Sequence, residues 1–122
     1  MLRSINDAPQ EIGDPIREFW PADKWDEAAS ISFEESGWKW QAEDDTTQNG
    51  LIPCGTVIGI IEGVEITAEH SIGYFQINSC NYPLWDSRHI FNARQNAGTA
   101  HALWQARGWQ PWYYSAKKLG LL

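Results

Sequence analysis

Small and apolar residues recur at three- and four-residue steps between residues 23 and 37, which is the spacing of an amphipathic helix. Asp23 can cap this helix at its N-terminus, and Gly37 is placed to end it. The positions of the stripe are Trp25, Ala28, Ala29, Ser32, Phe33 and Ser36. The pattern therefore predicts a first helix over residues 23–37.

The pattern changes to that of β-strands over residues 57–71. Residues 57–61 and 64–71 are rich in β-branched side chains, and Glu62-Gly63 supplies a two-residue turn between them. These features predict a hairpin. Because side chains alternate along a strand, we expect Glu69 and Ser71 on one face of the second strand, about 7 Å apart.

Helical spacing returns after Arg88 and ends at Gly108. The small and apolar stripe of this helix comprises Ala93, Ala97, Ala100 and Trp104. Residues 111–120 predict a last helix, because the stretch opens on a proline and closes on a glycine. The order of helix, hairpin and helices predicts a mainly helical α+β fold, with a small sheet beside a helical body.

The length of 122 residues fits one domain with a single core. Residues 1–21 contain three prolines, Pro9, Pro15 and Pro21, and we expect them to pack as an extension on the surface. The folded domain is then expected over residues 22–122.

Charge is distributed unevenly along the chain. All sixteen acidic residues lie at or before Asp86 with four basic ones, and five basic residues follow, so the parts carry −12 and +5. Scattered cations of this kind do not form the dense basic face that nucleic-acid binding requires. The longest apolar run, over residues 57–61, is far shorter than the roughly 20 residues of a membrane-spanning helix. The N-terminus has no apolar h-region, so we expect no classical signal peptide.

The chain contains two cysteines, Cys54 and Cys80. They form either one disulfide or two buried thiols, and the sequence leaves both possibilities open. No CxxC spacing is present, and the three histidines have no zinc-ligand spacing relative to one another or to the cysteines. Residues 43–45 are interpreted as a solvated acidic loop, with a calcium site as the alternative. We expect no metal and no cofactor.

Two short motifs flank the predicted hairpin. Glu35-Ser36-Gly37 ends the first helix, and Gly73-Tyr74-Phe75-Gln76-Ile77-Asn78 follows the second strand. In this order the chain resembles the lysozyme superfamily, most closely its lytic transglycosylase and phage-type lysozyme branch, from about residue 22 onward. The resemblance implies a lysozyme-like fold in which the hairpin forms one wall of the cleft. It also implies that Glu35 is the catalytic glutamate.

The chemistry of glycosidic cleavage agrees with a role for Glu35. The reaction needs an acid that is protonated near neutral pH, and a free glutamate, with a pKa of about 4.3, is not. Phe33, Trp38 and Trp40 surround Glu35 in the sequence and would disfavour its charged form. Glu34 lies about 100° away around the helix and is expected to point elsewhere. The structural alternative for Glu35 is an ordinary solvated residue at a helix end.

The second catalytic group decides between two reactions. A hydrolase uses a pair of carboxylates, whereas a lytic transglycosylase uses one glutamate as acid and then as base. In the animal-type lysozymes that share the second motif, an aspartate stands where this chain has Ser71. That difference favours transglycosylation, and Glu69, on the same strand face as Ser71, keeps a hydrolytic muramidase as the alternative.

Sugar binding is the role expected of several aromatic and amide residues. Pyranose rings stack on aromatic side chains, and sugar hydroxyl and acetamido groups need amides. The expected contacts are Tyr74, Gln76, Asn78, Trp38 and Tyr113. Gln76 and Asn78 have the alternative role of satisfying buried backbone groups. Most of the eight tryptophans are expected in the core.

The resulting expectation is an enzyme that cleaves the β-1,4 bond between N-acetylmuramic acid and N-acetylglucosamine in peptidoglycan strands. Its expected setting lies outside the cytoplasm, as a phage virion module, a lysin or part of a secreted protein, either monomeric or within a larger assembly. A glycan-binding or structural virion module without turnover is the alternative from another class. An interaction domain that uses the tryptophan-rich surface is a third.

Overall fold

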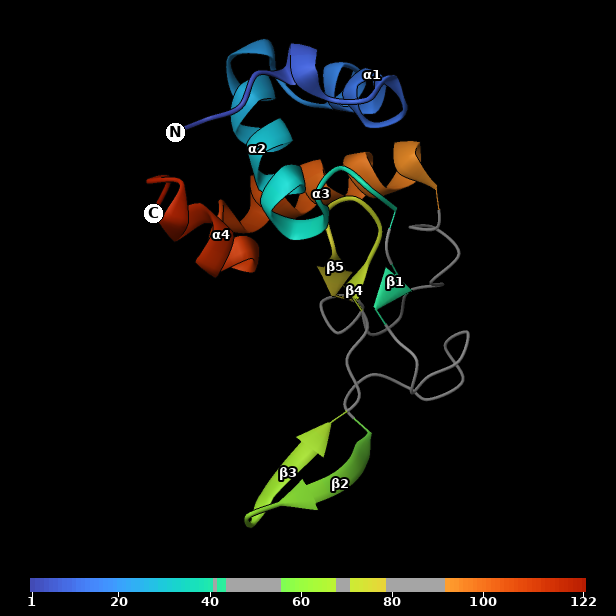
Figure 1. Cartoon of the computed structure of the whole chain (residues 1–122), viewed down its shortest axis with the longest axis vertical. Coiled ribbons are helices and arrows are strands. Elements are labelled where there is room, and N and C mark those ends of the chain that lie inside the picture. Colours follow the sequence, from blue (N-terminus) through green and yellow to red (C-terminus); the bar gives the residue numbers. More distant parts are fainter. Residues whose placement is uncertain (41, 44–55, 68–70, 79–91) are drawn as a thin grey trace.

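The computed structural model describes residues 1–40, 42–43, 56–67, 71–78 and 92–122. This part of the chain is mainly helical, with two small antiparallel sheets (Figure 1), which confirms the predicted α+β class. The α-helices are α1 (Gln10–Phe19), α2 (Trp25–Ser36), α3 (Ala93–Arg107) and α4 (Tyr113–Lys118). The 3-10 helices are η1 (Ile5–Asp7), η2 (Ala22–Lys24) and η5 (Gln110–Trp112). The strands are β1 (Ala42–Glu43), β2 (Val57–Ile61), β3 (Val64–Thr67), β4 (Ser71–Ile72) and β5 (Ile77–Asn78).

Local sequence explains how the longer helices begin and end. Helix α2 ends at Gly37, whose φ of 65° is the left-handed conformation expected of a C-terminal glycine. Asp23 does not cap α2, because it lies in η2, one 3-10 turn before the helix begins. Helix α3 is capped by the side chain of Asn92 and ends at Gly108, as predicted. None of the helices in the described ranges is long and apolar enough to span a membrane.

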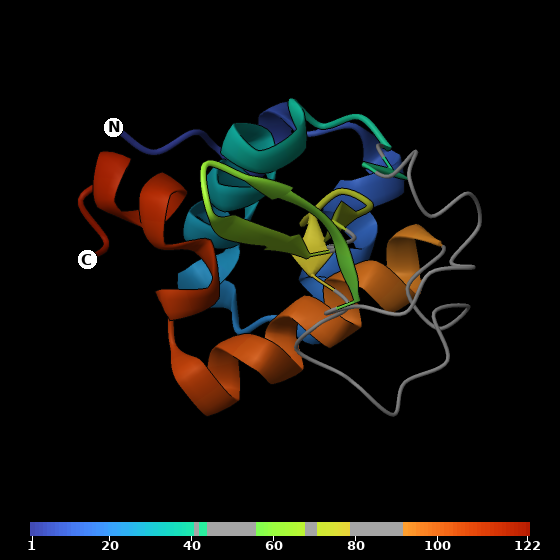
Figure 2. The same cartoon turned by 90° about the horizontal axis from the view of Figure 1, so that it is seen from below.

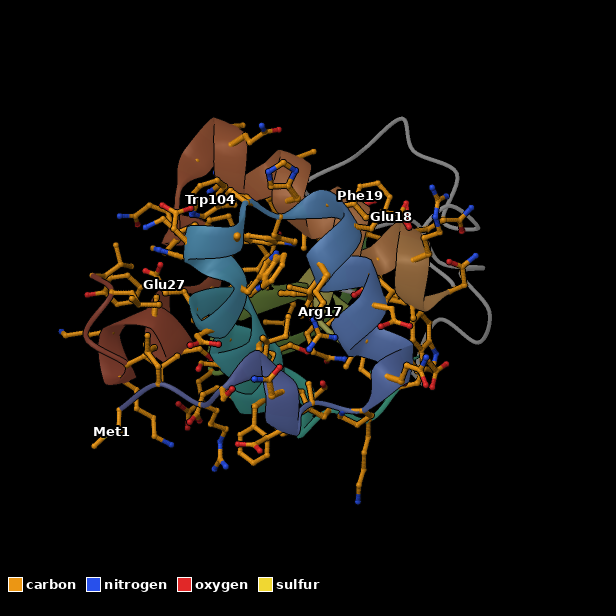
Figure 3. The ribbon with its side chains drawn as sticks, turned by 90° about the horizontal axis from the view of Figure 1, so that it is seen from above. Met1, Arg17, Glu18, Phe19, Glu27 and Trp104 are labelled. Carbon is orange, nitrogen blue, oxygen red and sulfur yellow. The ribbon has the colours of Figure 1, made fainter. Side chains whose placement is uncertain are left out.

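Helix α1 belongs to the core and is not a surface extension. Ile12 and Ile16 have no exposed area, and Trp20, at the end of the helix, is 3% exposed. The helix packs along α3, where Phe19 lies over Gly98 and the Trp20 indole N–H donates to the carbonyl of Ala97 at 3.2 Å (Figures 1 and 3). The expectation for residues 1–21 was therefore wrong. Their prolines lie in turns and within a short helix whose buried face repeats every four residues.

The strands form two separate sheets. Strands β2 and β3 pair as the predicted hairpin around Glu62-Gly63, both with positive φ as a tight hairpin turn requires. Strand β3 ends at Thr67, and Ser71 belongs to a second sheet of order β1-β4-β5, where it pairs with Glu43 and Asn78. The hairpin stands apart from the helical body, beyond this second sheet (Figures 1 and 2). The predicted continuous strand over residues 64–71 is thus divided between two sheets.

Tryptophans account for much of the core. Trp20 stacks on Phe75 and on Trp109 with ring centroids 5.8 and 5.7 Å apart, and Trp104 lies 5.3 Å from it. Seven tryptophans lie in the described part: Trp20, Trp109 and Trp112 are buried, and Trp25, Trp38, Trp40 and Trp104 pack against the core while partly exposed. The expectation that most tryptophans are structural is confirmed. Aromatic pairs at these distances add to the free energy gained by burial alone.

Candidate active site

The two sequence motifs meet in the structure through a pair of serine hydroxyls on α2. The hydroxyl of Ser36, the middle residue of the first motif, lies 2.8 Å from the carbonyl oxygen of Tyr74 and 2.9 Å from that of Ser32, and its one hydrogen is shared between these two acceptors. Ser32, one turn earlier, donates to the same carbonyl at 3.0 Å. Both serines are buried, so these bonds satisfy a carbonyl that has no access to solvent. The end of α2 is therefore fixed against the second motif.

Two further elements hold the turn over residues 73–76. Asn96 of α3, fully buried, accepts from the N–H of Phe75 at 2.8 Å and donates to the carbonyl of Ile72 at 2.9 Å. The indole N–H of Trp112, in η5, donates to the carbonyl of Phe75 at 2.9 Å. Four side chains from three helical elements thus bond to backbone groups of residues 72, 74 and 75, in and beside this turn. Such a network fixes the backbone more firmly than the turn's own bonds would.

Gly73 is required by this arrangement. Its φ is +82°, a conformation that other residues rarely adopt. A Cβ at this position would also lie 2.6 Å from Asn96 Cγ and 2.9 Å from Trp40 Cζ3. The glycine of the second motif therefore permits both the turn and the close approach of α3.

Glu35 lies at the end of α2, half-buried, and accepts a short hydrogen bond at Oε2 from the hydroxyl of Ser115 in α4. Glu34 forms a separate ion pair with Lys118 of the same helix at 3.0 Å. The two neighbouring carboxylates thus have different partners one helical turn apart on α4. Glu35 stands next to Ser36, so the candidate acid is joined to the second motif through one residue.

Tyr74 occupies a different place from the sugar-binding surface expected of it. Its side chain is 3% exposed, and its ring lies edge-on to Trp40 with centroids 5.7 Å apart. Its hydroxyl donates to Glu11 Oε2 of α1 at 2.6 Å. Burial, with the hydrogen bond to Glu11 and its charge, raises the pKa of Tyr74 from 10.0 to about 12. In this position Tyr74 joins the second motif to α1, and no face of its ring is open to a pyranose.

The other candidate sugar contacts differ in exposure. Gln76, with a positive φ of 48°, is half-exposed. Its side-chain amide Nε2 donates to the carbonyl of Gly73 at 2.9 Å. Trp38 is half-buried and donates to the carbonyl of Ala29 at 2.9 Å. Tyr113, at the start of α4, is 43% exposed. Asn78 is placed by its backbone in β5, opposite Ser71.

Several predictions fall outside the described residues. These concern Glu69, Cys54 and Cys80. The hydrolytic alternative through Glu69 and the disulfide between the two cysteines therefore stay predictions. Within the described ranges, no group of three or more His, Cys, Asp or Glu side chains is arranged to hold a metal ion.

The uneven charge of the chain is used in folding. Arg94 of α3 pairs with Glu18 of α1 at 2.6 Å, and Lys118 pairs with Glu34. Both pairs join a cation from the basic part of the sequence to an acid from the acidic part. The two pairs thus link α3 and α4 to the N-terminal helices, although exposed pairs of this kind contribute little to stability.

The contacts made by Ser32, Asn96, Trp112 and Ser115 were not foreseen from the sequence. They bridge residues far apart in the chain, up to 80 positions for Ser115 and Glu35. The one usable signal was the polarity of Ser32 and Asn96 on otherwise small or apolar helix faces, because a polar residue there needs a buried partner.

Comparison of the chain with protein-family models, with curated proteins and with solved structures found no match.

Proposed function

We propose that this chain is a lysozyme-like lytic transglycosylase that cleaves the β-1,4 bond between N-acetylmuramic acid and N-acetylglucosamine, with Glu35 as acid and base. In this proposal it acts on peptidoglycan strands outside the cytoplasm, as a virion module, a lysin or part of a secreted protein. The proposal rests on the two motifs that the sequence shares with that superfamily.

One observation carries the proposal: the hydrogen bond from Ser36 to the carbonyl of Tyr74. The two motifs lie 38 positions apart at this contact, and either one alone is short enough to arise by chance. Their union by a buried bond, beside a half-buried glutamate, supports their belonging to one site.

The proposed chemistry uses one carboxyl group twice. Glu35, protonated, gives its proton to the glycosidic oxygen as the bond to the anomeric carbon breaks. The resulting carboxylate then takes a proton from a hydroxyl of the muramic acid residue, and that oxygen closes onto the anomeric carbon. The product is an anhydro-sugar, and no water is consumed. Ser71, which has no carboxyl group, favours this path over a paired-carboxylate hydrolysis.

Product analysis tests the proposal directly. Purified peptidoglycan is incubated with the protein, and the soluble products are identified by mass spectrometry. Anhydro-muropeptides are expected. Muropeptides with reducing ends would show that the reaction is hydrolysis and not transglycosylation. Intact sacculi that retain the protein would show that it is a binding module and not an enzyme.

Two neighbouring variants assign the acid. Glu35→Gln should abolish product release, because an amide cannot supply the proton, with an expected loss of about 100-fold or more. Glu34→Gln makes the same chemical change one residue earlier and should keep near wild-type turnover, since Glu34 pairs with Lys118. Equal loss in both variants, or full activity in Glu35→Gln with a native circular dichroism spectrum, would exclude Glu35 as the acid.

A further inference from the structure

The hydroxyl of Ser115 reaches Glu35 from the opposite end of the chain. It donates to Oε2 of the carboxylate, and both side chains are half-buried. The residues are 80 positions apart, so only the packing of α4 against α2 brings them together. Neither motif of the sequence contains this serine.

The position of Ser115 is fixed by its neighbours on the same segment. Trp112 is 3% exposed and bonded to the carbonyl of Phe75 at 2.9 Å, and Ala116 has no exposed area. Lys118 adds the ion pair to Glu34 at 3.0 Å. These contacts fix how α4 packs against α2, and therefore the direction from which the Ser115 side chain approaches Glu35. Ser115, which is bonded to Glu35, thus lies three residues after Trp112, which is bonded to the second motif.

The last torsion of a glutamate side chain is broad and nearly two-fold, so a carboxyl group can turn either oxygen toward a substrate. A hydrogen bond to one oxygen removes this freedom. Acid catalysis requires the proton-bearing oxygen within hydrogen-bond reach of the oxygen that it protonates. An added donor to Oε2 therefore has a geometric consequence for the reaction, separate from its contribution to stability.

We propose that Ser115 is a positioning residue for Glu35: its hydroxyl holds Oε2, so that Oε1 faces the substrate and carries the transferred proton. The proposal rests on the proposed function of Glu35. Ser115 itself exchanges no proton with the sugar. Its hydroxyl stays bonded to Oε2 while Oε1 loses the proton to the leaving group and later takes one from the attacking hydroxyl.

A matched pair of variants separates the hydroxyl from the packing. Ser115→Thr keeps the hydroxyl, whereas Ser115→Val has nearly the shape of the threonine variant without it. Lys118→Met removes the ion pair between α4 and Glu34 and leaves the hydrogen bond between Ser115 and Glu35 in place. The pH dependence of kcat/KM on purified peptidoglycan is measured for all three, with thermal unfolding to confirm that each is folded at the assay temperature.

Ser115→Val should lose about 10-fold in kcat/KM at the optimum, because a misplaced acid retains most of its chemistry but reacts less often in the required geometry. The alkaline limb of its profile should also move to higher pH, since losing a donor to the carboxylate disfavours the charged form. Ser115→Thr should restore the wild-type limb, and Lys118→Met should leave it in place.

The outcomes distinguish this proposal from the proposed function. An inactive wild-type protein overturns the proposed function and the role of Ser115 with it. An active wild type and an inactive Glu35→Gln, together with a Ser115→Val profile equal to wild type, overturn the positioning role alone. If Ser115→Val and Lys118→Met lose the same amount of kcat/KM and neither shifts the alkaline limb, the positioning role is also overturned. Ser115 then serves only to pack α4 against α2.

Discussion

Replacing Asn96 by leucine should destabilise the fold strongly, although the two side chains have the same number of heavy atoms and the same branching at Cγ. Asn96 is fully buried and bonds the N–H of Phe75 and the carbonyl of Ile72 at 2.8 and 2.9 Å. Leucine would leave both backbone groups buried without these partners. Each such group costs about 1–3 kcal/mol, so the expected loss for the two groups is about 2–6 kcal/mol. That is a large part of the roughly 5–15 kcal/mol by which domains of this size are stable.

The assay is equilibrium unfolding in urea, followed by tryptophan fluorescence. The free energies of unfolding of wild type and variant are compared with a common m-value, the slope of that free energy against urea concentration. Asn92→Ala provides a graded control, because it removes the exposed N-terminal cap of the same helix, and its expected cost is about 1 kcal/mol. If Asn96→Leu lost less than about 1 kcal/mol, or less than Asn92→Ala, the turn would not depend on Asn96 for its bonds. The second motif would then keep its conformation without the bonds from Asn96.

Two further predictions concern the same turn. Gly73→Ala should cost about 3 kcal/mol or more in urea unfolding, because its positive φ and its contacts to Asn96 and Trp40 leave no room for a Cβ; a loss below 1 kcal/mol would show that the turn relaxes freely. The fold raises the pKa of Tyr74 to about 12 and so is stabilised by the protonated phenol. This stabilisation is complete below pH 10 and is lost as pH rises from 10 through about 12. Wild type should therefore lose about 2–3 kcal/mol more than Tyr74→Phe between pH 8 and pH 12; parallel losses would contradict the role of the Tyr74 phenol.

Local signals predicted the elements that depend on local chemistry. Gly37 and Gly108 end α2 and α3. Each has a positive φ, a conformation that glycine adopts without a Cβ clash. The Glu62-Gly63 turn was foreseen for the same reason. Helix α1 was missed because its prolines were given more weight than the four-residue repeat of Ile12 and Ile16.

Tertiary pairing explains what local signals could not supply. Alternation along residues 64–71 was consistent with a single strand, and only the pairing of Ser71 with Asn78 and Glu43 shows that the chain changes sheets. The candidate acid could be chosen from its motif, whereas its bond to Ser115 depends on how α4 packs. A serine within the segment Tyr-Tyr-Ser-Ala-Lys-Lys of residues 113–118 carries no mark of such a role.

The contact between Ser115 and Glu35 has a consequence for the order in which the protein is made. A ribosome adds residue 35 and both motifs before it adds residue 115, so a growing chain holds the glutamate and its turn while the serine is still to be translated. The hydrogen bond to Oε2 forms only after α4 has emerged and docked. The carboxyl group of Glu35 thus gains this hydrogen bond only after residue 115 has been synthesised and α4 has packed against α2.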